Sequence, residues 1–147
     1  MMSHRNLSLL GVDITFLASA QDTGGQWSLL EYTAPPQFRG PAPHWHRRTT
    51  EAFYIVEGQL CMQIGERVIE AQPGSFVLVA PGELHVWSNP HTAPCKFLVF
   101  VSPSGLENYF DEVAKLMQDE ATWPPADMSK VVAIAEKFDT FSPPVTV

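Results

Sequence analysis

The sequence lacks the features that mark disulfide-rich, nucleic-acid-binding and membrane-spanning proteins. Its two cysteines, Cys61 and Cys95, are too few for a disulfide framework, and both stand in apolar runs where we expect reduced core residues. Lys and Arg number 9 against 16 Asp and Glu, and no basic patch suited to phosphates is present, so no nucleic-acid partner is expected. No apolar run approaches the ~20 residues needed to span a bilayer, so no membrane partner is expected either.

An apolar run near the N-terminus resembles a secretory signal. Arg5 precedes the run LSLLGVDITFLASA, which ends on the small residues Ala18 and Ala20. Asp13 in the middle of this run argues against a signal peptide, because the apolar part of such a segment excludes charge. We therefore expect a cytoplasmic protein.

The composition and the strand pattern indicate one all-β domain. Of the 147 residues, 45% are hydrophobic and 17% are charged, which is enough apolar material for a core. Between residues 11 and 102, short β-rich runs alternate with Gly, Pro and Asn, as in antiparallel sandwiches and barrels. The runs predict strands at 11–18, 26–34, 51–57, 59–64, 67–71, 75–80, 84–88 and 95–102.

After Pro103 the pattern becomes helical. An apolar stripe predicts a helix over 104–121, with Ser104 as its N-cap. The stripe consists of Leu106, Tyr109, Phe110, Val113 and Leu116. A second helix is predicted over 127–138, with Asp127 or Ser129 as its cap. Its expected buried side consists of Met128, Val131, Val132, Ile134 and Ala135.

These patterns divide the chain into a barrel and an appendage. We expect residues 1–102 to form the β-barrel. Residues 103–147 are then a C-terminal helical extension, which lies on the barrel or at a dimer interface within one overall domain.

Three of the five histidines have a context that packing alone does not explain. His44 and His46 are separated by one residue, a spacing that points both imidazoles to one face of a strand, where they make a natural metal chelate. Glu51 and His85 each stand where a strand begins. Taken singly, such a histidine usually bonds the backbone, and such a glutamate usually marks a solvated strand end. Together, His44, His46, Glu51 and His85 favour a metal site.

Aromatic residues share the faces of these candidate ligands. Phe53 lies two residues beyond Glu51 and Trp87 two residues beyond His85, so both are candidates for the wall of a substrate pocket. Aromatic barrel interiors are also ordinary packing, and that alternative stays open. Trp45 should point the other way, toward the core or an interface.

The remaining polar residues near this region are less informative. Arg47 and Arg48 are the only adjacent cations, and they form either a solvated turn or a device that steers an anionic substrate. His4 and His91 have no candidate ligand beside them, and we expect both at the surface.

Two stretches carry a family resemblance. In 40–58, HxH is followed after four residues by Glu51 and after six more by Gly58, which resembles the first motif of the cupin superfamily. In 74–89, the positions of Gly74, Gly82, His85 and Asn89 resemble the second cupin motif, although the proline stands one position late. The resemblance implies a double-stranded β-helix, or jelly-roll barrel, with the same four residues as metal ligands. Over more of the chain, including the two helices, the sequence resembles the quercetinase-like single-domain cupins.

Three imidazoles and one carboxylate suit one divalent transition metal ion per chain, and Fe, Mn, Ni, Co, Cu and Zn all remain open. With the quercetinase-like resemblance, this ligand set favours an oxygenase that acts on a small aromatic or enolic, flavonol-like compound, with Glu51 as base as well as ligand. The alternatives are a metal-dependent isomerase or decarboxylase, and a non-catalytic binding or sensor protein. We expect a homodimer, because pairing covers exposed strand edges and the strand at 11–18 can add across such an interface.

Overall fold

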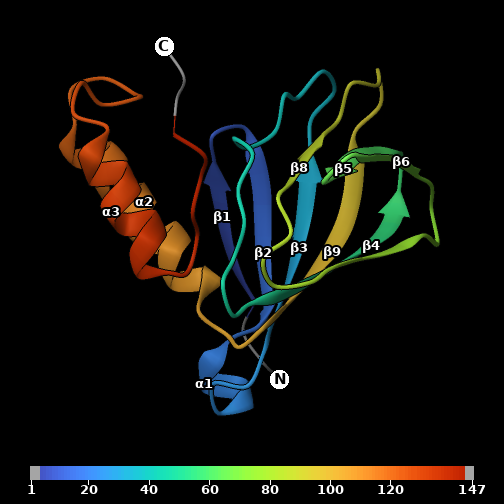
Figure 1. Cartoon of the computed structure of the whole chain (residues 1–147), viewed down its shortest axis with the longest axis horizontal. Coiled ribbons are helices and arrows are strands. Elements are labelled where there is room, and N and C mark those ends of the chain that lie inside the picture. The colour runs from blue at the N-terminus through green and yellow to red at the C-terminus, as the bar shows by residue number, and fades with distance from the viewer. Residues whose placement is uncertain (1–3, 145–147) are drawn as a thin grey trace.

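The computed structural model describes residues 4–144, which form two antiparallel sheets and three helices (Figure 1). The larger sheet has the order β1-β2-β3-β9-β4-β7, and the smaller has the order β6-β5-β8. The strands are β1 (Arg5–Leu9), β2 (Val12–Ala18), β3 (Ser28–Ala34), β4 (Thr50–Glu57), β5 (Leu60–Ile64), β6 (Arg67–Ala71), β7 (Phe76–Val79), β8 (His85–Ser88) and β9 (Cys95–Ser102). The helices are α1 (Ala20–Thr23), α2 (Leu106–Asp119) and α3 (Ser129–Lys137).

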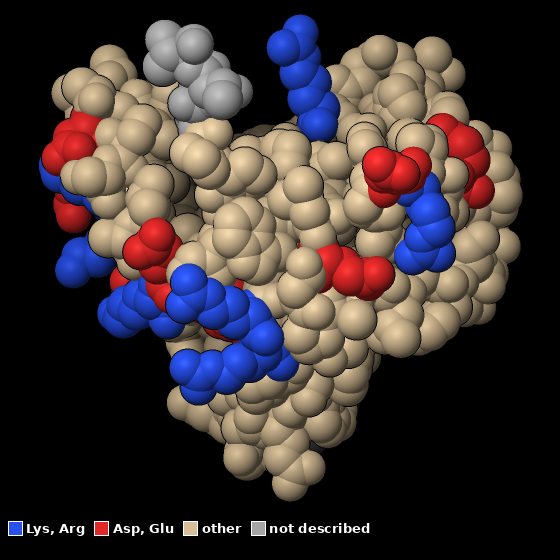
Figure 2. Space-filling model, viewed as in Figure 1, with Lys and Arg blue, Asp and Glu red and all other residues tan. Residues whose placement is uncertain are grey.

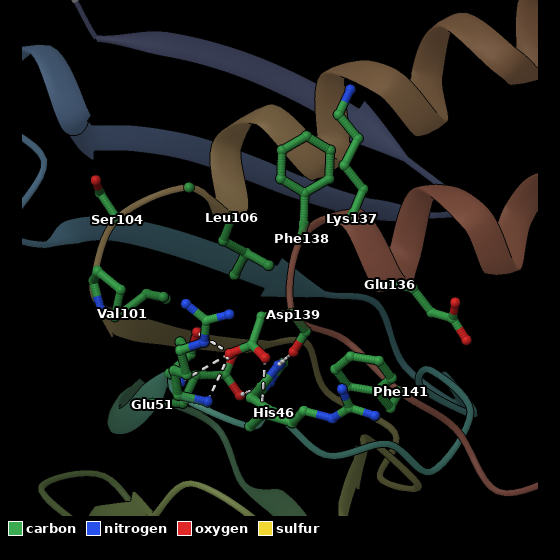
Figure 3. A pocket seen from close by; sticks show the side chains of 15 residues that line it. His46, Glu51, Val101, Ser104, Leu106, Glu136, Lys137, Phe138, Asp139 and Phe141 are labelled. Carbon is green, nitrogen blue, oxygen red and sulfur yellow. Dashed lines mark hydrogen bonds and ion pairs between the residues drawn. The ribbon is translucent and has the colours of Figure 1, made fainter.

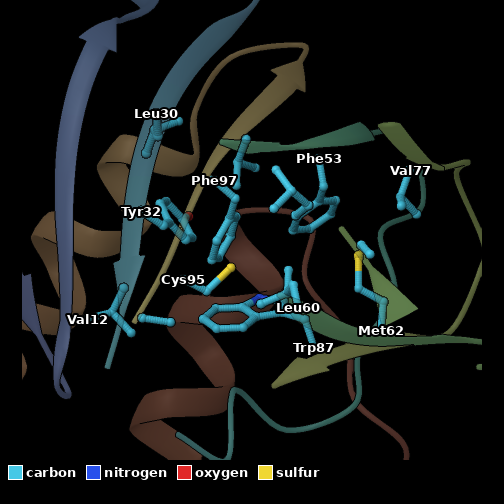
Figure 4. Packing of buried hydrophobic residues seen from close by; sticks show 14 of the residues in the cluster. Val12, Leu30, Tyr32, Phe53, Leu60, Met62, Val77, Trp87, Cys95 and Phe97 are labelled. Carbon is cyan, nitrogen blue, oxygen red and sulfur yellow. The ribbon is translucent and has the colours of Figure 1, made fainter. Parts of the chain in front are cut away.

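The core lies between the inner faces of the two sheets. Alternate residues of β9, from Cys95 to Val101, are buried, while those between them are half-buried, as expected for a strand with one face on the core. Aromatic rings from both sheets meet there: the Phe97 ring lies 5.3 Å from Tyr32 and 5.1 Å from Trp87, both nearly edge-on (Figure 4). The all-β prediction is confirmed.

All eight predicted strands are present, with ends that differ by at most two residues. An additional strand, β1, was not predicted, and it pairs with β2 in a hairpin in which Leu9 lies opposite Val12. Leu10 and Gly11 turn the chain with positive φ angles of 54° and 91°. Leucine rarely adopts this conformation, so the apolar sequence concealed the turn.

The short helix α1 was also missed. It begins at Ala20, the last of the small residues that end the apolar run, and the Ser19 N–H donates to the Asp22 carboxylate at 2.8 Å. Within residues 4–144, no helix is both long enough and apolar enough to cross a membrane.

Helix α2 packs on the barrel core through its apolar stripe. Leu106 and Phe110 contact the buried cluster, and the Phe110 ring lies 6.0 Å from Tyr32. The predicted N-cap, Ser104, is wrong: the cap position is Gly105, without a side-chain hydrogen bond to the helix.

Helix α3 is more exposed than predicted. None of its residues is fully buried, and Met128 and Val132 are 48% and 50% exposed. The position before the helix is Met128, but the Asp127 carboxylate accepts hydrogen bonds from the Ser129 N–H and hydroxyl. The division of the chain into a barrel at 1–102 and an extension at 103–147 stays a prediction.

A buried carboxylate fastens α2 to the larger sheet. Glu107 is 5% exposed and accepts hydrogen bonds from the Ser28 hydroxyl at 2.7 Å, the Ala20 N–H at 2.8 Å and the Gly105 N–H at 3.2 Å. The sequence pattern did not single out this residue, because its partners on β3 and α1 lie about 80 residues away in the chain.

We expect Glu107→Ala to lower the free energy of unfolding by about 2–4 kcal/mol, because it leaves buried donors without an acceptor. Urea unfolding followed by circular dichroism measures this. The matched control is Glu112→Ala on the same helix, which removes only an exposed pair with Lys137 and should change stability by less than about 0.5 kcal/mol. Equal losses in both variants would contradict the anchoring role of Glu107.

Candidate metal centre

The four predicted ligands meet at one point. One ligand atom from each of His44, His46, Glu51 and His85 lies within 4.8 Å of the others. The first two histidines precede β4, Glu51 is near the start of β4, and His85 begins β8 in the other sheet. The site therefore joins the two sheets at one end of the barrel.

A pair of backbone hydrogen bonds brings the histidines together. The His44 N–H donates to the His85 carbonyl at 3.0 Å, and the His85 N–H donates back to His44 at 2.9 Å. The two imidazole rings lie 4.3 Å apart, and each lies 5.2 Å from the ring of His46. The HxH segment thus makes isolated bridges, His44 to His85 and Trp45 to Phe141, and is not part of a longer strand.

Each imidazole is oriented by a backbone carbonyl. The Nδ1 atoms of His44, His46 and His85 lie 2.8, 2.9 and 2.9 Å from the carbonyl oxygens of Ala42, Asp139 and Glu83. A carbonyl only accepts, so each Nδ1 donates. In the neutral rings the lone pair is then on Nε2, the arrangement that favours metal binding.

Glu51 lies between two of these rings. Its Oε2 is 2.9 Å from His85 Nε2 and 3.2 Å from His46 Nε2, and the residue is 5% exposed. Burial alone would raise the pKa of Glu51, but the contacts with His46 and His85 outweigh it and hold the pKa well below its usual range. The carboxylate is therefore ionised at neutral pH.

The pKa values of two histidines move in opposite directions. Burial lowers the pKa of His44 to about 4, and the neighbouring His85 adds to the effect, so His44 is neutral at physiological pH. Burial would also lower the pKa of His46, but Glu51 and Asp139 together outweigh it and raise that pKa, because the protonated ring donates to the Glu51 carboxylate and to the Asp139 carbonyl and is attracted by both charges. Three converging imidazoles and one ionised carboxylate, all buried except the half-buried His44, fit a divalent transition metal ion.

A pocket of about 400 Å³ opens beside this cluster. Figure 3 shows Asp139 beside His46 and Glu51, with Leu106 and Phe138 across the pocket. The start of α2 and the segment that follows α3 thus form its walls, and Arg47 and Arg48 also line it. A small molecule can enter next to the candidate ligands.

The aromatic residues predicted for the pocket wall lie elsewhere. Phe53 and Trp87 are buried in the core cluster, where Trp87 stacks on Phe38 at 5.5 Å, and neither lines this pocket. Their role in contacting a substrate stays a prediction. Trp45 is half-buried, and its ring stacks on Phe141 at 6.0 Å.

Gly58 and Asn89, which end the two motifs at 40–58 and 74–89, hold loops in place. A side chain at Gly58 would place its Cβ 2.3 Å from the Pro94 carbonyl oxygen, so glycine is required for the close approach. Asn89 is fully buried, and its Nδ2 donates to the carbonyls of Ala34, Pro35 and Ala93. Both residues hold the barrel ends and do not touch the metal cluster.

The remaining histidines and the cysteines lie outside the site. His4 is exposed, and His91 is partly exposed and lies 3.1 Å from the Glu70 carboxylate. Cys61 and Cys95 form no disulfide; Cys95 is buried as expected, whereas Cys61 is only half-buried.

Comparison with known proteins agrees with the motifs and the fold. Residues 30–101 match the family described as Cupin domain. The chain belongs to the cupin superfamily. Over 69 residues it is 32% identical to quercetin 2,3-dioxygenase of Bacillus subtilis (strain 168), and over 49 residues it is 33% identical to oxidoreductase OpS7 of Beauveria bassiana (strain ARSEF 2860). The matches span 47% and 33% of this chain but only 20% and 16% of those two proteins.

Solved cupin structures show the same jelly-roll fold. A predicted oxalate decarboxylase of Thermotoga maritima superposes with a TM-score of 0.61 at 18% identity, covering 69% of this chain and 93% of that one. A sugar phosphate isomerase of Silicibacter pomeroyi DSS-3 superposes with a TM-score of 0.55 at 22% identity, covering 63% and 59%. The predicted jelly-roll barrel with C-terminal helices is confirmed.

We expect the metal-free protein to bind one equivalent of Co(II) or Zn(II), measured by equilibrium dialysis and elemental analysis. Replacing His44, His46, Glu51 or His85 with alanine should weaken binding by at least about 100-fold, more than the loss of a residue that only supports a ligand. His91→Ala removes a histidine outside the cluster and should leave the affinity unchanged. Stoichiometric metal in His44→Ala and His85→Ala would refute the ligand assignment.

Proposed function

We propose that this protein is a metal-dependent oxygenase acting on a small enolic or phenolic compound that carries negative charge. The observation that carries the proposal is the buried cluster of three imidazoles and one carboxylate beside a pocket of about 400 Å³. The similarity to quercetin 2,3-dioxygenase and to an oxidoreductase supports it. A divalent transition metal held by the four residues would supply Lewis acidity and redox chemistry.

Glu51 is the candidate base. Its carboxylate lines the pocket wall, and although its low pKa makes it a weak base, it would accept the proton of an enol or phenol hydroxyl acidified by a bound metal. His46 lies beside it and is anchored through Nδ1, which holds both groups in place while the proton moves. The three histidines serve as ligands.

The charges around the pocket favour an anionic substrate. Arg47 and Arg48 both line it, and Figure 2 shows Lys and Arg side chains gathered on this face, near the helices. The nearby Asp139 carboxylate is occupied by backbone N–H groups, and Lys137 is paired with Glu112. Glu136 also lines the pocket, and the Arg47 guanidinium lies over the Phe141 ring at 4.1 Å, so Arg48 is the better candidate for steering an anionic substrate.

A second candidate function is non-oxidative. The isomerase and the predicted decarboxylase show that this fold also occurs in proteins named for such reactions. A metal acting only as Lewis acid, with Glu51 moving a proton, would suit an isomerase or decarboxylase. A non-catalytic binding or sensor protein remains the third alternative.

Oxygen uptake tests the oxygenase proposal. Protein reconstituted with Fe, Mn, Ni, Co, Cu or Zn is mixed with flavonols, catechols and diketones, and we expect oxygen consumption that depends on metal and substrate. Glu51→Gln and His44→Ala should reduce the rate by at least about 100-fold, since catalytic groups contribute on this scale. Conversion of the same compounds under strict anaerobiosis would favour the second candidate, and no turnover with any metal would refute the oxygenase.

Arg48→Gln should raise KM for an anionic substrate from this panel about tenfold, because it removes a charge-assisted contact. The difference should shrink in added salt, which screens an exposed charge. Arg67→Gln, on β6 and outside the pocket lining, is the matched control and should leave KM unchanged. Equal KM values for the Arg48 variant and the wild type would remove the support for an anionic substrate.

The expected homodimer and the cytoplasmic location stay predictions. Exposed apolar side chains on the outer face of β4 and β7 support a dimer, since they form a surface that a second copy is able to cover. These side chains are Tyr54, Val56, Phe76 and Leu78.

A further inference from the structure

The turn between two candidate ligands is held by a residue from the other end of the chain. Residues 47–49 connect His46 to the strand that carries Glu51. The Asp139 carboxylate accepts hydrogen bonds from the N–H groups of Arg47 at 2.9 Å and Arg48 at 2.8 Å. It also accepts from the N–H and hydroxyl of Thr49, at 3.0 and 2.8 Å. One carboxylate thus satisfies every N–H of the turn.

The residues around Asp139 make further contacts with His46 and with its neighbour Trp45. We call residues 138–141 the C-terminal strap. The Asp139 carbonyl accepts the His46 Nδ1–H at 2.9 Å, and Thr140 Oγ1 lies 3.4 Å from the same nitrogen. Trp45 and Phe141 exchange two backbone hydrogen bonds, at 2.8 and 2.9 Å. The strap therefore fixes the residues on both sides of His46 as well as its ring (Figure 3).

We propose that Asp139 is a positioning residue for the metal centre, and that docking of the strap and binding of the metal are thermodynamically linked. The inference rests on the metal site of the proposed function but not on its reaction. His46 and Glu51 stand five residues apart, so their relative placement depends on the turn that Asp139 holds. Because linkage is reciprocal, a metal that binds the placed ligands also stabilises the docked strap.

The backbone conformation of Asp139 permits substitutions that change its hydrogen bonds without straining the chain. Its φ is 57°, a left-handed conformation that asparagine and glycine adopt more readily than other residues. Asp139→Asn keeps the backbone preference but replaces one acceptor oxygen with an NH₂ group that faces N–H donors. Asp139→Gly also tolerates the conformation but removes the carboxylate. Both variants change the hydrogen bonds with little backbone strain.

Asp127 provides the matched control. It lies at the other end of α3, and its carboxylate accepts from the Ser129 N–H at 3.0 Å and the Ser129 hydroxyl at 2.6 Å. It stabilises the same helix without hydrogen bonds to the turn among the described residues. Asp127→Asn therefore reports the effect of weakening the C-terminal region alone.

The experiment uses the full chain and Co(II) as the probe. Wild type, Asp139→Asn, Asp139→Gly and Asp127→Asn are stripped of metal and titrated with Co(II) against a chelator, while the visible absorption of Co(II) is recorded. We expect both Asp139 variants to bind Co(II) about 10–100-fold more weakly, with an altered spectrum, because a residue that orients a ligand is lost. Asp127→Asn should keep the wild-type affinity and spectrum.

Hydrogen exchange tests the linkage directly. The N–H groups of residues 47–49 should exchange faster in the Asp139 variants than in wild type or Asp127→Asn. Added Co(II) should slow exchange at 138–141 in wild type.

Three results would overturn the inference: wild-type affinity and spectrum in both Asp139 variants, equal weakening by Asp127→Asn, or no binding of Co(II) by the wild type. If Co(II) binds, the Asp139 variants weaken it and no substrate is oxidised, the oxygenase proposal fails and this inference stands.

Discussion

The site depends on the burial of an ionised carboxylate among imidazoles. Removing Glu51 from water is costly, and the contacts with His46 and His85 outweigh that cost enough to keep it ionised. The rings in turn need fixed partners, which the carbonyls of three different segments supply. Within residues 4–144 no buried side-chain nitrogen or oxygen lacks a hydrogen-bond partner. A cluster satisfied in this way has one arrangement, which is what a metal centre requires.

The need for one fixed arrangement of the four ligands explains why the site draws on both sheets of the barrel. Glu51 and His85 belong to different sheets, and the backbone bridge between His44 and His85 links them at one end of the barrel. At the opposite ends of β4 and β8, Gly58 permits close backbone contact with Pro94, and Asn89 ties three carbonyls together. The barrel thus supplies Glu51 and His85 from the starts of two strands and holds beside them the irregular segment that carries His44 and His46.

Short-range sequence patterns predicted most of the strands and all four candidate ligands. They did not reveal features that depend on contacts between residues far apart in the chain. Period-two alternation located the strands from β2 to β9, and the spacing from His44 to Glu51 and from Gly74 to Asn89 identified the cluster that the structure brings together. The β1–β2 turn was missed because Leu10 occupies a conformation that leucine seldom adopts. The buried side of α3 was overestimated because an apolar stripe does not show how much partner surface is available.

The two polar residues that sequence patterns missed, Glu107 and Asp139, share a physical character. Each is a carboxylate in the helical region whose partners are N–H or O–H groups about 80–90 residues away, so no local pattern marks it.

Other acids of this region also have specific partners: Asp111 pairs with Arg5 and Glu120 with Lys130. Residues 103–147 contain eight Asp and Glu against three Lys, and several of these acids therefore make specific contacts. Some of these contacts tie the helices to the barrel, and Asp139 ties the helices to the metal centre. A change in the helical region can consequently reach the site through the strap without altering any of the four candidate ligands.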